Sequence, residues 1–565
     1  MRVPRRRDGP RWSPFALALF LGCSGGTAGS ADEPGTDGAV APPTTIPGVW
    51  FREVAEPAGV VFRRLPTEYD AAPQRFSGGV CLLDADLDGR LDLFFPGDAD
   101  PRRSGPHLYV ARAPLRYEDQ TKTRGLGQVG AGGGCVAFDL EGDGDLDLLI
   151  TGKDTLRLFR NDGGAFVDVT SRLGSPLAPG VFATSAVAFD ADGDGDLDLA
   201  VGTFGRYVAP PEGTVCFGPC DAQILNYEYS GTILLLQRDD GTFVDHDGPV
   251  FRRKEPTLVL LATDLDDDGR VDLFVGNDLG AYHDRYLRRR DDGVWEDVGE
   301  ALGVAWATRS KSGLSSMSAF DADVDGDGRL DLVESSNDIE PDALFRCAPG
   351  GTLGTSCRDV ADDLELFRTP RTYRWGQVLV DFDHDGVLEL FEGLGHYQYL
   401  QEAGGLSPDY KTLDRPLLWH RDDVSSPFAI APPTLGLSAQ TAARGVVAAD
   451  LDDDGDLDVV VGTAFGRPLL LENVHEKRGR SVQLRLSAHG KNPFAVGARV
   501  RVKVGVRTVP FVVHAGSGYA SSGDPRLHLG VGNATTVTVD VDWPSGKKTR
   551  GLVVPAEGTQ PILEP

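Results

Sequence analysis

Residues 186–202 read AVAFDADGDGDLDLAVG, an acidic nine-residue loop with an apolar run on each side. The same pattern, Asp-x-Asp/Glu-x-Asp-Gly-x-x-Asp/Glu, occurs seven times, and successive copies begin 51 to 74 residues apart. We call these copies the first to seventh acidic loops: 84–92, 139–147, 190–198, 264–272, 323–331, 381–389 and 450–458. They hold 33 of the 85 acidic residues in a chain of 565. Such a repeat predicts an architecture built from one recurring unit.

The spacing within each acidic loop suits a bound Ca²⁺ ion. Acidic side chains at positions one, three and five face the same side of a tight loop, and glycine at position six permits a sharp reversal of the chain. A backbone carbonyl at position seven and a carboxylate at position nine complete a cage of oxygen ligands, which Ca²⁺ prefers. A merely solvated acidic surface would not require glycine at position six in all seven copies. We therefore expect several Ca²⁺ ions, up to one for each of the seven loops.

The expected ligand residues occupy positions one, three, five, seven and nine of each loop. They are Asp84, Asp86, Asp88, Arg90, Asp92, Asp139, Glu141, Asp143, Asp145, Asp147, Asp190, Asp192, Asp194, Asp196, Asp198, Asp264, Asp266, Asp268, Arg270, Asp272, Asp323, Asp325, Asp327, Arg329, Asp331, Asp381, Asp383, Asp385, Val387, Glu389, Asp450, Asp452, Asp454, Asp456 and Asp458. The sixth loop departs most from the pattern, because Glu389 closes it and His384 stands inside it. An EF-hand is excluded: its last acid stands at position twelve and a helix follows, whereas here the strand-like run 91–95 and its equivalents begin at position eight.

Hairpin signals follow several of the loops. Residues 156–169 and 233–244 each contain two strand-like runs separated by an Asp-Gly turn, which is typical of antiparallel strand pairs. Each repeat then supplies about four antiparallel strands, the unit of a β-propeller blade. Residues 51–54 match the last strand of a unit but precede the first loop, so we expect them to complete the last of seven blades. Residues 476–565 alternate in a strand-like way and predict a small antiparallel β domain.

Composition and the N-terminus indicate an exported protein. The net charge of −29 argues against nucleic-acid binding through phosphate contacts, and no stretch after residue 30 is apolar enough to span a bilayer. A basic segment and the apolar run 15–21 predict a signal peptide over 1–22. Gly22-Cys23 resembles a bacterial lipoprotein cleavage site, so we expect a lipid on Cys23, with ordinary secretion as the alternative. Residues 23–47 have the composition of a flexible linker.

Export places the remaining six cysteines in an oxidising compartment. Four of them bracket turn-rich loops and predict local disulfides, Cys216–Cys220 and Cys347–Cys357. Cys81 and Cys135 occupy nearly equivalent positions in successive repeats, and the sequence leaves open whether they meet.

The repeats and the C-terminal segment together resemble a known family. The acidic loops and the hairpins after them are similar to the FG-GAP/VCBS repeats of integrin-α-type β-propellers. The C-terminal motifs resemble, in order, those of the ASPIC/UnbV domain of the cartilage acidic protein family and its bacterial relatives: VGARV (496–500), GSGYASS (516–522), HLGVG (528–532) and WPSG (543–546). The resemblance implies a propeller over 48–475 and an ASPIC/UnbV-like β domain over 476–565.

The resemblance also implies a calcium-loaded binding or adhesion module for an extracellular protein or glycan. Its expected location is the bacterial outer membrane, cell surface or periplasm if Cys23 carries a lipid, and the medium otherwise. No motif of a serine hydrolase, P-loop or dinucleotide-binding enzyme occurs, so no catalytic residue is assigned. The alternative is a calcium-dependent polysaccharide lyase or another carbohydrate-active enzyme, because propellers also carry enzymes. Any specificity is expected in two insertions rich in Tyr and Pro, 207–229 and 395–435, the second of which also carries Trp419; the alternative is that both are tolerated surface insertions without a role in binding.

Overall fold

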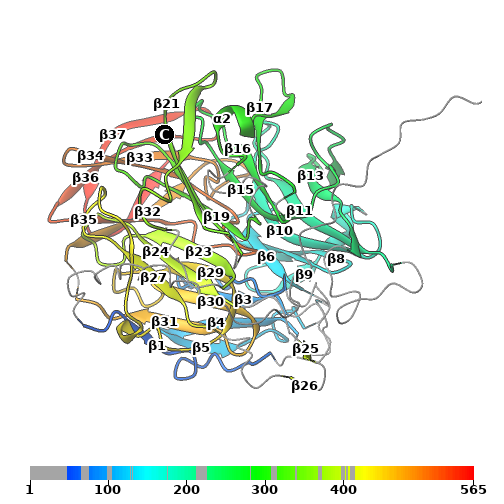
Figure 1. Ribbon diagram of the computed structural model, residues 1–565, viewed down its shortest axis with the longest axis horizontal. Helices are drawn as coiled ribbons and strands as arrows, with labels where there is room; N and C mark the ends of the chain where they lie inside the picture. The colour runs from blue at the N-terminus through cyan, green and yellow to red at the C-terminus, as the bar shows by residue number, and fades with distance from the viewer. Residues whose placement is uncertain are drawn as a thin grey trace, which may run out of the picture. The chain divides into compact units, whose positions relative to one another are not determined.

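Seven sheets of four main antiparallel strands account for the repeats in the computed structural model (Figure 1). The structure describes residues 48–565 except 65–75, 98–104, 128, 130–131, 175, 211–225, 280, 307–314, 338–339, 367–371, 396–400, 403–404, 407–413 and 477. We number these sheets as blades one to seven, in the order of the acidic loops they contain. The expected all-β, seven-bladed propeller followed by a small β domain is confirmed.

The acidic loop of every blade joins its first strand to its second. Blade one consists of β2 (Cys81–Leu83), β3 (Asp92–Phe95), β4 (His107–Ala113) and β5 (Arg116–Asp119). Blade two consists of β6 (Gly134–Phe138), β7 (Asp147–Gly152), β8 (Thr155–Asn161) and β9 (Phe166–Asp168). Blade three consists of β10 (Val181–Phe189), β11 (Asp198–Tyr207), β13 (Gly231–Gln237) and β14 (Phe243–Asp245), and β12 (Tyr227–Glu228) pairs with β11. Blade four consists of β15 (Thr257–Thr263), β16 (Asp272–Asn277), β17 (Arg285–Arg289) and β18 (Trp295–Asp297).

The last three blades continue this order. Blade five consists of β19 (Ser318–Ala322), β20 (Asp331–Ser335), β21 (Ala343–Gly350) and β22 (Gly354–Asp359). Blade six consists of β23 (Arg374–Val380), β24 (Glu389–Leu394), β27 (Leu417–His420) and β28 (Ala429–Ile430). Blade seven consists of β29 (Ala442–Ala449), β30 (Asp458–Phe465), β31 (Leu469–Asn473) and β1 (Phe51–Glu53). A short hairpin, β25 (Gln401–Glu402) and β26 (Gly405–Leu406), lies between β24 and β27 in sequence.

The helices among the described residues are short: η1 (Thr170–Leu173), α2 (Gly299–Leu302) and η4 (Pro433–Leu435). In the part of the chain that the structure describes, none has the length and apolar character needed to cross a membrane.

The N-terminal strand completes blade seven, as the sequence predicts. β1 pairs antiparallel with β31, and Phe51 lies opposite Asn473. Seven apolar clusters then join each blade to the next around the ring. One of them combines Leu82 of blade one with Val447 of blade seven. The ring therefore closes through a blade made from both ends of the propeller segment, which joins these ends by backbone hydrogen bonds.

The strands after β31 form two further sheets. One sheet has the order β34 (Arg507–Val512), β33 (Arg499–Val504), β36 (Thr536–Asp542) and β37 (Lys548–Pro555). The other has the order β35 (Leu527–Gly532), β32 (Arg480–Ser487) and β38 (Gly558–Leu563). The β domain is antiparallel except for one parallel pair, β32 with β38. Val500, Val539 and Trp543 are among the side chains of its shared core.

The segment between β34 and β35 reaches the first strands of several blades. Ser522 exchanges backbone hydrogen bonds with blade one, because it accepts from Leu82 N at 2.9 Å and donates to Val80 O at 3.1 Å. Cys135 N of blade two donates to Ala520 O at 3.2 Å. Since first strands line the axis of a propeller, this segment lies at the centre of the ring.

Tyr519 fills the space at this centre. Its side chain is 1% exposed, and its ring centroid lies 5.1 Å from that of Trp375. Its hydroxyl donates to Phe76 O at 2.7 Å. Gly516 makes the close approach possible: its φ is +91°, and an added Cβ would lie 2.6 Å from Ala186 O. The GSGYASS motif is therefore the part of the C-terminal segment that enters the propeller.

Two disulfides are present among the described residues. Cys347–Cys357 joins β21 to β22 and confirms the predicted local pair. Cys81–Cys135 joins β2 of blade one to the first strand of blade two, which settles the question that the sequence left open. The predicted signal peptide, Cys23, the linker and the Cys216–Cys220 pair lie outside the described residues.

Candidate metal centres in the acidic loops

The leading carboxylates of a loop converge on one point. In the first, third, fourth and sixth loops, positions one, three and five each offer an oxygen, and these oxygens lie within 4.8 Å of one another. In the fifth loop, the converging residues are Asp323, Asp325 and Asp331, at positions one, three and nine. Each of these loops thus brings together acids that the sequence pattern singles out.

Backbone amides shape each loop around its first residue. Asp84 accepts hydrogen bonds from Asp88 N at 3.0 Å and from Gly89 N at 2.9 Å. The bond from position six to the first aspartate recurs in the other six loops. The glycine at position six has φ between 88° and 101° in every loop, a conformation that other residues rarely adopt. The role predicted for this glycine is confirmed.

Position four carries a second left-handed residue, which the sequence analysis did not single out. The residues there have positive φ in all seven loops: Leu87, Gly142, Gly193, Asp267, Gly326, His384 and Asp453. Three glycines and two aspartates at one position were the available signal, because both residue types tolerate this conformation.

The closing acid at position nine ties the loop to its own blade. Asp92 accepts from Ala85 N of the loop at 2.9 Å and from Ala111 N of the third strand at 2.7 Å. The same pair of amide contacts recurs at Asp147, Asp198, Asp331 and Asp458. Position nine therefore has a structural task in addition to the ligand role expected of it.

The sixth loop differs at this position too. Glu389 accepts from Phe382 N at 2.9 Å, but its other oxygen lies 3.3 Å from His420 Nδ1. His384 is fully buried, and its ring centroid lies 5.3 Å from that of His528. The two residues at which the sixth loop departs from the pattern, His384 and Glu389, thus lie close to further histidine side chains.

Burial makes ionised loop carboxylates costly. Burial, with a smaller contribution from neighbouring carboxylates, raises the pKa of Asp139 and of Asp190 to about 6 and that of Asp198 to about 8. At neutral pH such groups are stabilised by a cation placed among them. A donor set dominated by carboxylate oxygens fits a hard ion such as Ca²⁺. The position-seven carbonyls stay predicted ligands, at Arg90, Asp145, Asp196, Arg270, Arg329, Val387 and Asp456.

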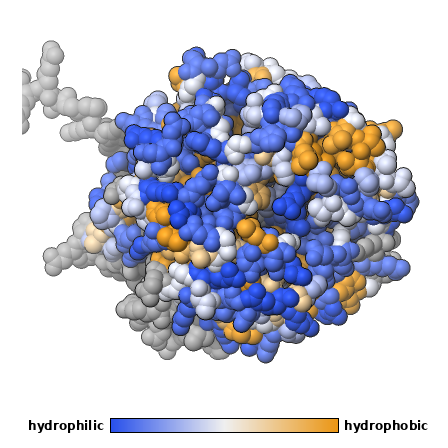
Figure 2. Space-filling model, turned by 180° about the vertical axis from the view of Figure 1, so that it is seen from behind, coloured by the Kyte–Doolittle hydropathy of each residue, from blue (hydrophilic) through white to orange (hydrophobic). Residues whose placement is uncertain are grey.

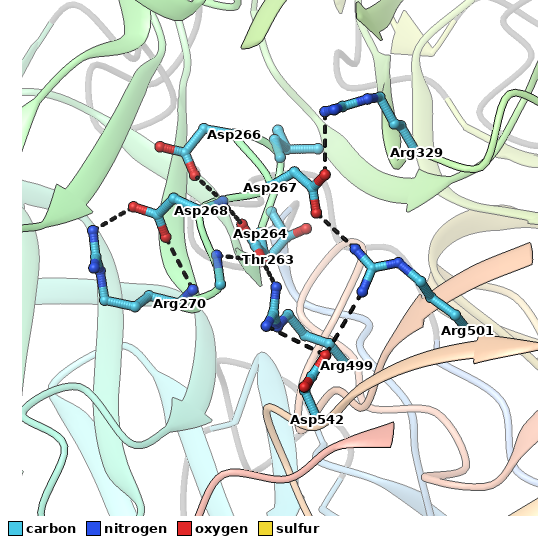
Figure 3. Close-up of polar contacts among 12 residues, drawn as sticks. Thr263, Asp264, Asp266, Asp267, Asp268, Arg270, Arg329, Arg499, Arg501 and Asp542 are labelled. Atoms are coloured by element: carbon cyan, nitrogen blue, oxygen red, sulfur yellow. Dashed lines mark hydrogen bonds and ion pairs between the residues drawn. The ribbon is translucent and has the colours of Figure 1, made fainter. Parts of the chain in front are cut away.

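Arginines supply positive charge at the fourth loop (Figure 3). Arg499 Nη1 of β33 lies 2.8 Å from Asp264 Oδ2, with Asp264 almost fully buried. Asp267 lies between two further guanidinium groups, at 2.7 Å from Arg501 and 3.3 Å from Arg329. Part of the charge of this loop is therefore balanced by the protein itself.

Polar side chains of the C-terminal segment reach at least four of the acidic loops. Besides the fourth loop, the segment contacts the third through Lys491, whose Nζ lies 2.7 Å from Asp196 Oδ2. Arg478 Nε lies 3.1 Å from Asp383 Oδ2 of the sixth loop. Gln483 Nε2 donates to Asp450 Oδ2 of the seventh loop at 3.0 Å. This role was not predicted from the sequence, where the available signal was the cluster of basic residues that follows the acidic repeat region.

Parts of the two insertions proposed to set specificity lie outside the described residues: 211–225 in the first, and 396–400, 403–404 and 407–413 in the second. In the first, Tyr227 and Glu228 form β12 and extend blade three. In the second, Trp419 is buried in β27, where its Nε1 donates to Glu392 Oε2 at 2.6 Å. Trp419 is therefore a core residue of blade six rather than a surface contact.

Two parts of the chain match known protein families. Residues 488–564 match the family described as ASPIC and UnbV, and residues 139–201 match an FG-GAP-like repeat. The resemblance stated from the sequence motifs is confirmed.

Relatives are found over most of the chain. It is 24% identical to cartilage acidic protein 1 of Homo sapiens over 546 residues, which cover 90% of this chain and 76% of the human protein. The Mus musculus protein is also 24% identical, over 88% of this chain and 75% of its own length.

Similar solved structures include BBS1N in complex with ARL6DN, with a TM-score of 0.39 and 9% identity over 72% of this chain and 94% of that chain. Another is an Agrocybe aegerita lectin that recognises non-reducing terminal N-acetylglucosamine, with a TM-score of 0.35 and 17% identity over 63% of this chain and 79% of that one. At these TM-scores neither structure informs the ligand of this chain.

Proposed function

We propose that this chain is an exported, calcium-binding β-propeller that acts as a binding or adhesion module for an extracellular protein or glycan. The observation that carries the calcium proposal is the convergence of three acidic side chains within single loops, in the first, third, fourth, fifth and sixth loops. The FG-GAP-like repeat and the relatives named cartilage acidic protein support a propeller-based binding module.

Calcium in this proposal is structural. It neutralises buried carboxylates that repel one another and fixes the loop between the first two strands of a blade. At extracellular affinities near ~10⁻⁴ M, ~1 mM Ca²⁺ contributes roughly 1.4 kcal/mol for each site by mass action. Seven such sites amount to about 10 kcal/mol, which is comparable to the stability of a whole domain.

The first experiment counts bound calcium and measures its effect on unfolding. The exported chain is dialysed against chelator, then titrated with Ca²⁺, while bound metal and the melting temperature are measured. We expect several ions for each chain and a large upward shift in melting temperature. The variant Asp190→Asn should lose about one ion, because Asp190 is the residue around which the third loop folds.

The matched control removes one negative charge outside the loops. Glu557 is an exposed acid whose nearest partner, Arg480 Nη1, lies 3.8 Å away. Glu557→Gln should keep both the ion count and the calcium-induced shift. Absence of bound metal and of any shift in the unmodified chain would refute the calcium proposal.

The second experiment addresses the binding role. Glycan and extracellular-protein arrays are probed with the exported chain, once in millimolar Ca²⁺ and once in chelator. Binding in Ca²⁺ without any change to the ligand supports a binding module. Release of unsaturated sugar products would contradict it and indicate a lyase.

The third experiment addresses location. We propose that Cys23, which lies outside the described residues, carries the lipid anchor. Labelling with radioactive palmitate should mark the unmodified chain and leave Cys23→Ala unmarked. A chain recovered unlabelled in the medium would show ordinary secretion instead.

A further inference from the structure

Two blades carry a buried glutamate where the others carry an apolar residue. Three residues after the closing acid of the loop, blades five and six have Glu334 and Glu392, both 0% exposed. The equivalent residues of the other five blades are Phe95, Ile150, Val201, Val275 and Val461, all buried. Two carboxyl groups therefore stand inside the protein at positions that elsewhere belong to its apolar core.

Each glutamate meets an aspartate of the preceding blade. Glu334 lies against Asp284, the residue before β17 of blade four, and the two groups are within hydrogen-bonding contact. Glu392 lies in the same way against Asp342, the residue before β21 of blade five. Both aspartates are buried. The two pairs are repeat-related copies, one at the junction of blades four and five and one at the junction of blades five and six.

The copies differ in what balances their charge. Arg374 stands seven residues before the sixth loop, and its Nε lies 2.5 Å from Asp342 Oδ1. The equivalent residue seven positions before the fifth loop is Ser316, which carries no charge. Two ionised carboxylates without a cation would be strongly unfavourable in this environment. Something else must neutralise the Asp284–Glu334 pair.

The number of hydrogens available for the hydrogen bonds identifies a proton as the neutralising charge. Ser316 Oγ lies 2.7 Å from Asp284 Oδ1 and also forms a short contact with Glu334 Oε1. A hydroxyl group has a single hydrogen to donate, so one of the two contacts requires a hydrogen on a carboxyl group. Asp284 Oδ1 also accepts from Asn277 N at 2.8 Å, which favours the ionised form of Asp284 and places the hydrogen on Glu334.

We propose that Asp284, Ser316 and Glu334 form a proton-sharing joint between blades four and five, which loosens when the shared proton is lost at alkaline pH. At this junction a proton offsets one negative charge of the carboxyl pair, and at the next junction the guanidinium group of Arg374 does so. It lies at the end of the strands opposite the acidic loops, because Asp284 immediately precedes a third strand and Glu334 is near the end of a second strand.

The electrostatic surroundings of the pair also favour its protonated state. Burial raises the pKa of Asp284 to about 7 and holds that of Glu334 well above its usual range. The charged groups facing the pair are the acids Glu340 and Asp359, which disfavour ionisation, and Arg285, whose guanidinium is paired with Glu255 at 2.9 Å. A carboxyl group whose folded-state pKa is raised stabilises the fold at low pH, and this stability is lost as pH rises through the folded value.

The test compares unfolding of the calcium-saturated chain with that of Glu334→Gln between pH 6 and pH 9. The amide supplies a permanent hydrogen, so the variant keeps a neutral partner at every pH. Relative to the variant, the folding constant of the unmodified chain should fall by up to about tenfold for each pH unit below the folded-state pKa of the pair, and should level off above it. Other titrating groups cancel in this comparison. If Glu334→Gln fails to fold, Asp284→Asn replaces it as the reference variant, because its pair also keeps a neutral partner at every pH. The same difference in pH dependence from the unmodified chain is then expected.

Infrared spectroscopy supplies an independent readout. A band of a buried protonated carboxyl group should be present at neutral pH, disappear at alkaline pH and be missing in Glu334→Gln. The matched control Glu392→Gln should keep the component that belongs to Glu334 and lose only its own, because burial also holds the pKa of Glu392 well above its usual range. A difference in stability that does not change with pH, or a lower metal count in Glu334→Gln, would overturn the proposal; the latter would place a metal ion in the joint.

Discussion

Truncating Tyr519 should uncouple the C-terminal sheets from the propeller. The side chain is 1% exposed, packs against Phe76 and Trp375, and donates its hydroxyl hydrogen to Phe76 O at 2.7 Å. Removing a buried aromatic ring costs about 3–5 kcal/mol, and losing the hydrogen bond adds about 1 kcal/mol. Tyr519→Ala should therefore lower the free energy of unfolding by about 4–6 kcal/mol, whereas Tyr519→Phe should lose about 1 kcal/mol.

Urea unfolding followed by tryptophan fluorescence measures this effect, because Trp375 lies 5.1 Å from the Tyr519 ring. We expect one main transition for the unmodified chain and two separated transitions for Tyr519→Ala. Tyr117→Ala is the matched control: Tyr117 is a buried tyrosine of the cluster between blades seven and one, away from the C-terminal segment. It should cost similar stability without splitting the transition. A loss below about 1 kcal/mol for Tyr519→Ala, with a single transition, would refute the view that this residue holds the two parts together.

Three further predictions follow from the loops and the disulfides. Without Ca²⁺, the free energy of unfolding should fall as pH rises from 5 to 8, because burial raises the folded-state pKa of Asp139 to about 6 and that of Asp198 to about 8, both above the values in the unfolded chain. Calorimetry at a series of pH values, with and without Ca²⁺, measures this dependence. An equal slope in both conditions would contradict the prediction. Arg499→Ala should destabilise the fold by about 3 kcal/mol, because it leaves the buried Asp264 without its partner, whereas Arg550→Ala, at an exposed pair, should cost less than about 1 kcal/mol in the same urea assay. Replacing Cys81 and Cys135 by Ser should cost about 4 kcal/mol and replacing Cys347 and Cys357 about 3 kcal/mol, since the first disulfide closes the longer loop, with separations of 54 and 10 residues; the reverse order would show that loop closure does not dominate.

Several features of the fold were accessible from the sequence because they are local. The acidic loop is specified by residues within nine positions, and its glycine at position six has the positive φ that the pattern requires, as at Gly89 and Gly455. The ring closure through Phe51 was also accessible, because a unit whose last strand precedes its first loop has only one place to complete a blade. The Cys347–Cys357 disulfide followed from its position around a hairpin turn.

Other features depended on contacts between distant residues. The double amide contact of Asp92 includes Ala111, which the chain reaches only after forming a third strand. The Cys81–Cys135 disulfide requires the first strands of two blades to lie side by side, a distance that repeat spacing alone does not give.

By itself, the sequence determined the repeat, the loop geometry, the strand content and the number of blades, because each depends on side chains and backbone preferences within one unit. Only the tertiary structure decided that polar side chains of the C-terminal segment reach the acidic loops, that Tyr519 enters the propeller and that Asp284 meets Glu334. These contacts join residues 50 or more positions apart in sequence. Their formation depends on how whole sheets pack, and no local periodicity or turn preference encodes that packing.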